Sequence, residues 1–270
     1  MPVIVNSQHL LEKTKEYRLS IQADLNGFSF SVIDDSKREV LYLYSSEFSV
    51  IHGESELYAK ECAKIITEQP IFRRKFKTVD LIYFTEKYSL IPTKLYQKGT
   101  ELEELSKLHN IDELEEVNTI DILRNEMVMI YAVSSTLLNL IQKYHPNLTT
   151  YPTPYIYLNI LPDLDGYNKL FFQYIGNIVT VVAAENERIV FCNSFSASNF
   201  SSALYFVLLA LKQAQFNPEL TTIYINGNIK DYEIFDITRY FSKVNYFRNK
   251  EIPLGDPIAE MRYSTMLFKL

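Results

Sequence analysis

The chain has 270 residues, a length that predicts either two domains of ordinary size or one large domain. Apolar residues make up 47% of the chain and charged residues 22%, so it can bury a substantial core, and long disordered stretches are not expected. The formal net charge of −6 supplies no basic face for a phosphate backbone, and we therefore expect no nucleic-acid partner.

Dense runs of β-branched and aromatic residues predict a series of strands near the start of the chain. Strands are expected at residues 28–34 and 40–45, after a first strand that ends at Asp24, because turn residues separate these runs. Apolar residues then recur at helical spacing over residues 54–69, which predicts an amphipathic helix. A further strand at residues 79–84 completes the order β-β-β-α-β.

The following segment adds elements to this unit. A capping-box pattern predicts a helix over residues 101–109. Residues 112–125 are rich in acids, and a solvated loop or an edge strand is a better interpretation than an acidic binding site. A buried strand is expected at residues 127–133, and Ser134 is expected to cap a helix after it.

A cluster of prolines gives the clearest domain boundary. Pro146, Pro152 and Pro154 follow one another closely, so we place the first domain at residues 1–148 and the second at residues 149–270. Pro154 suits the first turn of a short helix that opens the second domain, although the same apolar run could form a strand.

The second domain repeats the order of the first. When Gly27 is aligned with Gly176, strands are expected at residues 177–183 and 189–194, followed by a helix over residues 201–215. That helix is apolar on nearly all sides, which predicts that it is buried. A last strand follows at residues 222–226, and because it leaves a helix it is expected to pair in parallel.

Two tandem β-β-β-α-β units resemble the actin-like ATPase superfamily, through residues 18–48, 169–195 and 222–228. The resemblance implies an α/β protein with a duplicated actin-like (ribonuclease H-like) fold, in which two domains each hold a mixed sheet and further helices. The order of elements, with a long helix and a strand near residues 127–145, also resembles the assembly-platform branch of the superfamily. More closely, the chain is similar to an uncharacterised bacterial group, domain-of-unknown-function family 3822.

In active members of the superfamily, Mg-ATP binds between the domains, with an Asp at the end of each first strand and a glycine-rich turn after it. The first copy has Asp24-Leu-Asn-Gly27, whereas Gln173 faces Asp24 in the second copy, and a neutral amide cannot hold a divalent cation. The third loop has one glycine where active members have two. The candidate residues of this vestigial interdomain cleft are Asp24, Asn26, Gly27, Gln173, Gly176 and Gly227.

These departures favour a non-catalytic actin-like scaffold that binds a protein partner, with no cofactor and no metal. The alternative is a Mg-ATP-dependent actin-like ATPase or sugar-kinase-like phosphotransferase in which Asp24 is the magnesium-linked acid. Abundant aromatic residues suit an interface. For the tyrosines at the domain boundary, Tyr151, Tyr155 and Tyr157, packing of the seam between the domains is the better interpretation.

The sequence has neither a signal-peptide pattern nor an apolar run long enough to span a membrane, so we expect a cytoplasmic protein without membrane insertion. Cys62 and Cys192 are in no metal spacing and are expected to be small core residues. The four histidines are scattered singly, which argues against a zinc site.

Overall fold

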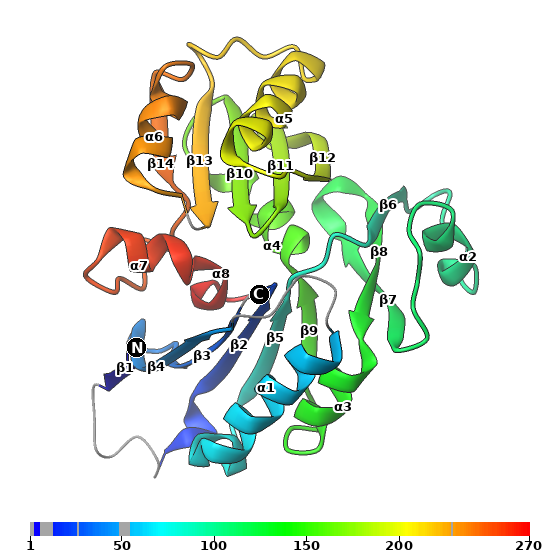
Figure 1. Ribbon diagram of the computed structural model, residues 1–270, viewed down its shortest axis with the longest axis vertical. Helices are drawn as coiled ribbons and strands as arrows, with labels where there is room; N and C mark the ends of the chain where they lie inside the picture. Colours follow the sequence, from blue (N-terminus) through cyan, green and yellow to red (C-terminus); the bar gives the residue numbers. More distant parts are fainter. Residues whose placement is uncertain (1–2, 6–12, 26, 49–54, 228) are drawn as a thin grey trace.

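The computed structural model describes residues 3–5, 13–25, 27–48, 55–227 and 229–270. Two mixed sheets lie one above the other, and a smaller antiparallel sheet stands beside them (Figure 1). The fold is the duplicated actin-like α/β fold expected from the sequence.

The first sheet has the order β1-β4-β3-β2-β5-β9. Its strands are β1 (Val3–Val5), β2 (Arg18–Asp24), β3 (Gly27–Asp34), β4 (Glu39–Glu47), β5 (Thr78–Tyr83) and β9 (Thr149–Pro152). The second sheet has the order β12-β11-β10-β13-β14. Its strands are β10 (Asn168–Ile175), β11 (Ile178–Glu185), β12 (Arg188–Ser196), β13 (Thr222–Gly227) and β14 (Lys243–Tyr246).

The smaller sheet has the order β6-β8-β7, from strands β6 (Tyr88–Pro92), β7 (Glu115–Ile122) and β8 (Met127–Ser134). The acidic segment thus contains an edge strand, β7, as expected. The helices are α1 (Ser55–Glu68), α2 (Glu101–Ser106), α3 (Ser135–Gln142), α4 (Thr153–Ile160), α5 (Phe200–Gln213), α6 (Asp231–Thr238), α7 (Pro257–Arg262) and α8 (Ser264–Leu267). Short 3₁₀ turns lie at Thr14–Glu16, Pro70–Arg73, Leu123–Asn125 and Leu161–Asp163.

The local signals at α3 and α4 are confirmed. Ser134 caps α3, since its side chain accepts a hydrogen bond from the Leu137 backbone amide. Pro154 lies in the first turn of α4, so the apolar run after it forms a helix and not a strand. The helix predicted at residues 101–109 is shorter than expected and ends at Ser106.

The order β-β-β-α-β occurs twice, and even a β-bulge is repeated. The register between β3 and β4 shifts at Val32/Ile33, and the register between β11 and β12 shifts at Ala183/Ala184. In each copy the first strand pairs antiparallel with the second and parallel with the strand after the helix. This shared pattern defines which residues are equivalent in the two copies.

The structural alignment of the two copies differs by two residues from the alignment on glycines. β2 ends at Asp24, which pairs with Gly27, and β10 ends at Ile175, which pairs with Ile178. Ile175 is therefore the equivalent of Asp24, and Gln173 is the equivalent of Gln22. The expectation that Gln173 faces Asp24 was wrong, because Gly27 begins a strand whereas Gly176 lies in the turn.

Each sheet is covered on one face by a helix that crosses from the other copy. α4 follows β9 and packs on the second sheet, where the Tyr157 ring stacks on Phe171 with 3.8 Å between ring centroids. α7 and α8 follow β14 and lie between the two sheets, and Met266 and Leu267 are fully buried against the first sheet (Figure 1). The segment from Ile252 onward thus packs on the first sheet although it follows the second in the chain.

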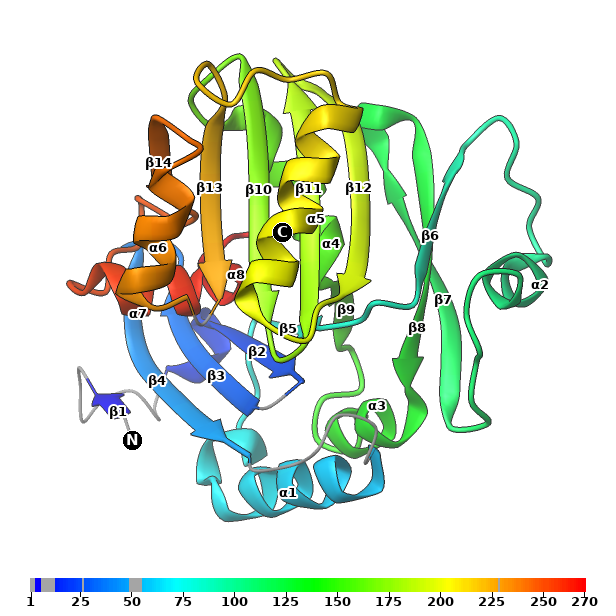
Figure 2. The same ribbon diagram turned by 45° about the horizontal axis from the view of Figure 1, so that its top comes forward.

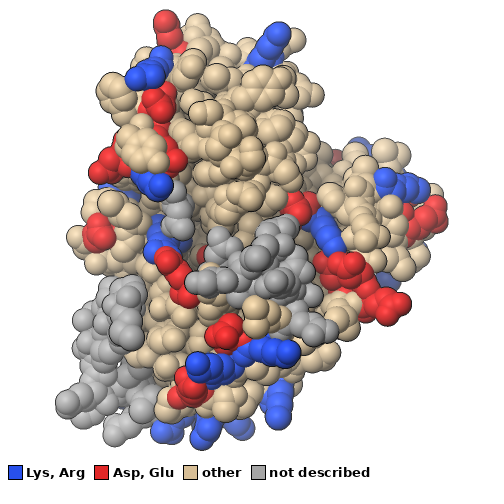
Figure 3. Space-filling view, viewed as in Figure 1, with Lys and Arg blue, Asp and Glu red and all other residues tan. Residues whose placement is uncertain are grey.

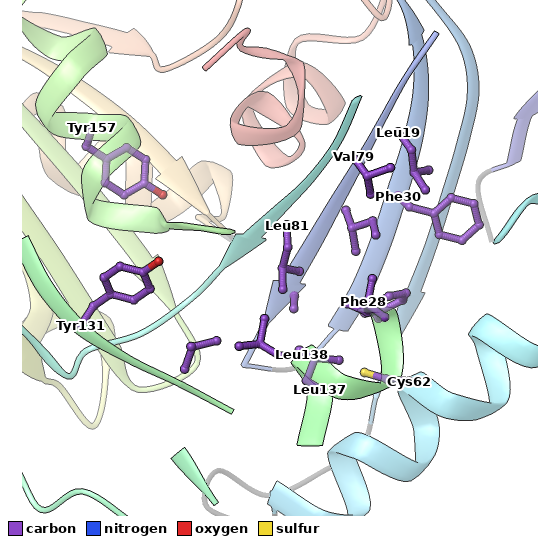
Figure 4. Packing of buried hydrophobic residues seen from close by; sticks show 14 of the residues in the cluster. Leu19, Phe28, Phe30, Cys62, Val79, Leu81, Tyr131, Leu137, Leu138 and Tyr157 are labelled. Carbon is purple, nitrogen blue, oxygen red and sulfur yellow. The ribbon is translucent and has the colours of Figure 1, made fainter. Parts of the chain in front are cut away.

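The opposite face of the first sheet packs on α1 and α3. Phe28 lies beside Cys62 of α1 and near Leu137 and Leu138 of α3, and Leu19 and Phe30 belong to the same buried cluster (Figure 4). Cys62 is fully buried, as expected, and burial raises the pKa of its thiol to about 12. Cys192 is half-buried in β12, and burial raises the pKa of its thiol to about 12 as well.

The expectation that α5 is buried on all sides was wrong. The helix lies on the outer face of the second sheet, where only one of its sides is covered (Figure 2). On its outer side Tyr205 is 61% exposed and Leu209 is 40% exposed. An apolar helix therefore presents an uncovered side to solvent.

Candidate interdomain site

A small pocket lies between the two copies, at the ends of β2 and β13. Its volume is about 170 Å³. It is lined by Asp24, Gly27, Ser29, Ser45, Ser46, Glu47 and Phe48 from the first copy, by Ile175 and Gly227 from the second, and by Arg262 of α7. Asp24, Gly27 and Gly227 were predicted from the sequence, and the structure brings these three together.

Asp24 supplies a carboxylate to this pocket. The Gln22 side-chain amide donates a hydrogen bond of 2.7 Å from Nε2 to Oδ2 of Asp24. Burial raises the pKa of Asp24 to about 6, against the hydrogen bond from Gln22 and the charge of Arg262, which both lower it. A carboxyl group that is partly protonated near neutral pH is a weaker ligand for a divalent cation than a fully ionised one.

Gln173 lies beside the pocket but does not line it. Its side chain is only 2% exposed, and Nε2 donates hydrogen bonds to the Tyr157 hydroxyl (2.5 Å) and to Oδ1 of Asn226 (2.9 Å). Asn226 in turn donates to Oγ of Ser264, at 2.9 Å. Gln173 is thus engaged by protein groups, and its Oε1 has no hydrogen-bond partner among the described residues.

The C-terminal segment closes the pocket. Arg262 forms an ion pair with Glu47 across the seam between the copies. Thr265 donates a hydrogen bond of 2.5 Å from Oγ1 to Oε1 of Gln22, and Arg18 donates to the carbonyl oxygens of Met266 (3.2 Å) and Phe268 (3.1 Å). The pocket is therefore fixed from both copies and from the segment that lies between them.

The three described candidate glycines are required by the protein backbone. A Cβ at Gly27 would lie 2.9 Å from the Ser46 carbonyl oxygen, and one at Gly227 would clash with the Tyr174 carbonyl oxygen. Gly227 also has a φ of 102°, and Gly176 has a φ of 61° in the β10–β11 turn. Each of these glycines therefore has a structural reason that involves no phosphate.

The remaining sequence predictions have different outcomes. Asn26 lies outside the described residues. Tyr157 packs the seam between the copies, as the second interpretation of the boundary tyrosines expected. Arg262 was missed, because it carried no motif and because the path of the chain after residue 250 could not be read from local patterns.

A larger pocket, which the sequence did not indicate, lies within the first copy. Its volume is about 650 Å³, and it opens between α1 and α3 beside the start of β7. It is lined by Ala59, Lys60, Ala63, Tyr83, Asp112, Leu114, Glu115, Ser134, Thr136, Asn139 and Leu140. Its acids are already engaged, since Lys87 forms ion pairs with Glu115 (2.7 Å) and Asp112 (3.2 Å).

Within the described ranges, no group of three or more His, Cys, Asp or Glu side chains could hold a metal ion. The interdomain pocket offers Asp24 and Glu47 as acids, and Glu47 is paired with Arg262. Such a pocket can bind a small polar group, but among the residues that the structure describes its lining has neither a second free carboxylate nor the open glycine turns of a phosphate site.

Comparison with protein families identifies the family of this chain. A family profile described as "Protein of unknown function (DUF3822)" matches residues 6–244. The chain belongs to the DUF3822 family. A comparison with curated proteins found no match. Among the described helices of this DUF3822 protein, none is long and apolar enough to cross a membrane.

Solved structures of three other proteins show the same fold. A Bacteroides thetaiotaomicron protein with an actin-like ATPase fold and unknown function is 21% identical, with a TM-score of 0.77, over 88% of this chain and 93% of that one. The PilM–PilN type IV pilus biogenesis complex matches with 9% identity and a TM-score of 0.54, over 93% and 96%. The ethanolamine utilization protein EutJ from Carboxydothermus hydrogenoformans matches with 8% identity and a TM-score of 0.50, over 94% and 90%.

Proposed function

We propose that this DUF3822 protein is a non-catalytic actin-like scaffold that binds a partner protein and whose interdomain cleft does not bind Mg-ATP. The observation that carries the proposal is the size of the interdomain pocket. Its volume of about 170 Å³ falls below the range of roughly 300–1,000 Å³ typical of small-molecule and cofactor sites. A nucleotide would have to displace Arg262 and the helices that follow β14.

The lining of the pocket supports the same proposal. Ile175 occupies the position equivalent to Asp24, so an apolar side chain stands where the second carboxylate of an active member would be. The glycines that could have approached a phosphate are instead in close contact with neighbouring strands. Catalysis of phosphoryl transfer depends on positioned cations and donors, and the cation in the described lining, Arg262, is already paired with Glu47.

A protein partner is supported by two further observations. A neighbour with the same fold, PilM, occurs in a complex with PilN. The outer side of α5 is apolar and uncovered, and large apolar patches on soluble proteins commonly mark interaction sites. We place this scaffold in the cytoplasm, since both of its thiols are free.

The alternative is a Mg-ATP-dependent ATPase or a sugar-kinase-like phosphotransferase. Asp24 is the observation that favours it, because a carboxyl group with a raised pKa in a cleft between domains is often functional. Under this alternative the helices α7 and α8 would move away when nucleotide binds.

Thermal unfolding with millimolar Mg-ATP separates the two functions. A ligand at 100 times its dissociation constant stabilises the folded state by about 2.7 kcal/mol, which raises the melting temperature of a protein of this size by roughly 5–10 °C. We expect a shift of less than about 1 °C. A magnesium-dependent shift of several degrees that is lost in Asp24→Ala but kept in the exposed control Glu113→Gln would refute the scaffold and favour the ATPase.

A further inference from the structure

The strand β12 ends the second sheet, and among the described strands it pairs only with β11. Its outer edge therefore presents backbone groups without a strand partner. The Ser194 amide is one of them, since it donates to the side-chain oxygen of its own neighbour, Asn193, at 2.9 Å. Alternation along a strand puts the Cys192 amide on the same edge.

The first copy shows what covers the equivalent edge. There β4 is the counterpart of β12, and β1 pairs with it antiparallel, with Val3 opposite Tyr44 and Val5 opposite Tyr42. The bulge shared by the two copies makes Phe191–Asn193 of β12 equivalent to Tyr42–Tyr44 of β4. This fold therefore accepts a short strand of β-branched residues at this position, and in the second copy no strand of the described residues occupies it.

The side chains near this edge are unusually free of charge. Between Arg188 and Lys212 the sequence has no Asp, Glu, Lys or Arg. The face over α5 accordingly shows almost no charged atoms (Figure 3). Exposed edge strands are normally protected against pairing by charged side chains or proline. An edge without such protection favours the addition of a strand.

Aromatic rings continue the edge onto α5. Phe195 stacks on Phe206 with 4.5 Å between ring centroids, and Phe191 lies 6.5 Å from Phe195. Tyr205 contacts the edge of the Phe206 ring at 5.6 Å and is 61% exposed. A strand added to β12 would place alternate side chains against this row of rings, with a hollow of about 550 Å³ at its end beside Tyr205.

We propose that β12 is a docking site for an extended segment of a partner protein, which adds to the second sheet as an antiparallel strand. The segment is uncharged and rich in β-branched residues, as β1 is on the first sheet. Backbone hydrogen bonds to the edge amides provide affinity, and apolar side chains against Phe191 and Phe195 provide selectivity. The site is separate from the interdomain pocket, so it stands whether or not that pocket binds nucleotide.

Hydrogen exchange of the β12 amides tests the proposal with the peptide Met-Pro-Val-Ile-Val-Asn, the sequence of residues 1–6. We add the peptide up to about 5 mM and expect the Cys192 and Ser194 amides to exchange more than about tenfold more slowly once the site is saturated. An amide that is hydrogen-bonded nine-tenths of the time can exchange only during the remaining tenth. The same peptide with its Val-Ile-Val amides N-methylated keeps its side chains and carbonyl groups but cannot donate to the β12 carbonyl oxygens. Its methyl groups also keep the two strands apart, so we expect no slowing.

Matched variants locate the site. Asn193→Lys places a charge in the middle of the edge and is expected to weaken peptide binding at least about fivefold. Asn245→Lys makes the same change on β14, the opposite edge of the same sheet, and is expected to leave binding unchanged. Unchanged exchange with the first peptide, or equal slowing by both peptides, refutes strand addition. A dimer in sedimentation whose β12 amides are slow without peptide also refutes it and assigns the edge to a second copy of this chain.

Discussion

Gln22 and Gln173 occupy the same position in the two copies of the fold, and each is hydrogen-bonded to a hydroxyl group of the helix that crosses onto its sheet. Gln22 accepts from Thr265 of α8, and Gln173 donates to Tyr157 of α4. The pair marks the centre of the seam between the copies. Polar contacts there are buried, so their loss should be costly.

Gln173→Leu is expected to lower the free energy of unfolding by roughly 2–3 kcal/mol, because it leaves the Tyr157 hydroxyl and Oδ1 of Asn226 buried without their donor. Tyr157→Phe should cost less, and the double variant less than the sum of the two, since the residues are in contact. Urea denaturation measures all three. Tyr167→Phe, at a 66% exposed position, should change little, and strictly additive effects would contradict the described contact.

Asp24 should make stability depend on pH. Its folded-state pKa of about 6 exceeds its ordinary value of 3.8, so the folded protein binds this proton more tightly than the unfolded chain. The free energy of unfolding therefore falls as pH rises from about 4 to about 6. Asp24→Asn removes this loss, and we expect it to be more stable than the wild type by roughly 3 kcal/mol at pH 8 and no more stable at pH 4. An equal difference at both values of pH in urea denaturation would count against the raised pKa.

Substitution of two glycines distinguishes the cost of backbone strain from the cost of a steric clash. Gly227 and Gly99 have similar φ values of 102° and 97°, but a Cβ at Gly99 would meet nothing within 4 Å, whereas one at Gly227 would clash with the Tyr174 carbonyl oxygen. Gly99→Ala should cost about 1 kcal/mol from strain alone. Gly227→Ala should cost more than about 3 kcal/mol in thermal unfolding. Similar costs for the two would mean that β13 can move away from β10.

Both thiols should react slowly in the folded state. Burial raises the pKa of Cys62 and of Cys192 to about 12, so little thiolate exists at pH 8. We expect iodoacetamide to label each at least about a hundredfold more slowly than in 6 M guanidinium chloride, as followed by mass spectrometry. Fast labelling of Cys192 alone would indicate that β12 separates from Tyr88, whose hydroxyl lies 3.5 Å from the thiol.

The sequence predicted elements well where a local rule applies. The serine cap at Ser134 and the proline in α4 each depend on a few neighbouring residues, and both appear as expected. The register between the copies was mispredicted because two glycines with different roles were aligned. Gly27 allows close contact with β4, while Gly176 provides a positive φ in a turn.

The cover of the candidate site could not be predicted by such rules. Arg18, Ser20 and Gln22 alternate with apolar residues along β2, a pattern that shows a polar face but not what lies on it. The structure places α8 there, and the Arg18–Met266 contact joins residues 248 positions apart. No short-range signal links such distant positions, so Arg262 could not be recognised as part of the pocket.

Because helices cross from each copy onto the sheet of the other, the order of synthesis determines when the packing of the first sheet can be completed. The strands of the first sheet are synthesised early, but residues 263–267, which cover one of its faces, are added some 240 positions later. Until the end of the chain leaves the ribosome, Ile33, Leu43 and Ile82 lack their contacts with Met266 and Leu267, and the buried guanidinium of Arg18 lacks two of its acceptors. Contacts of such long sequence separation form slowly. The nascent first copy therefore exposes part of a sheet face until the last residues are added, and exposed apolar surface of this kind favours aggregation.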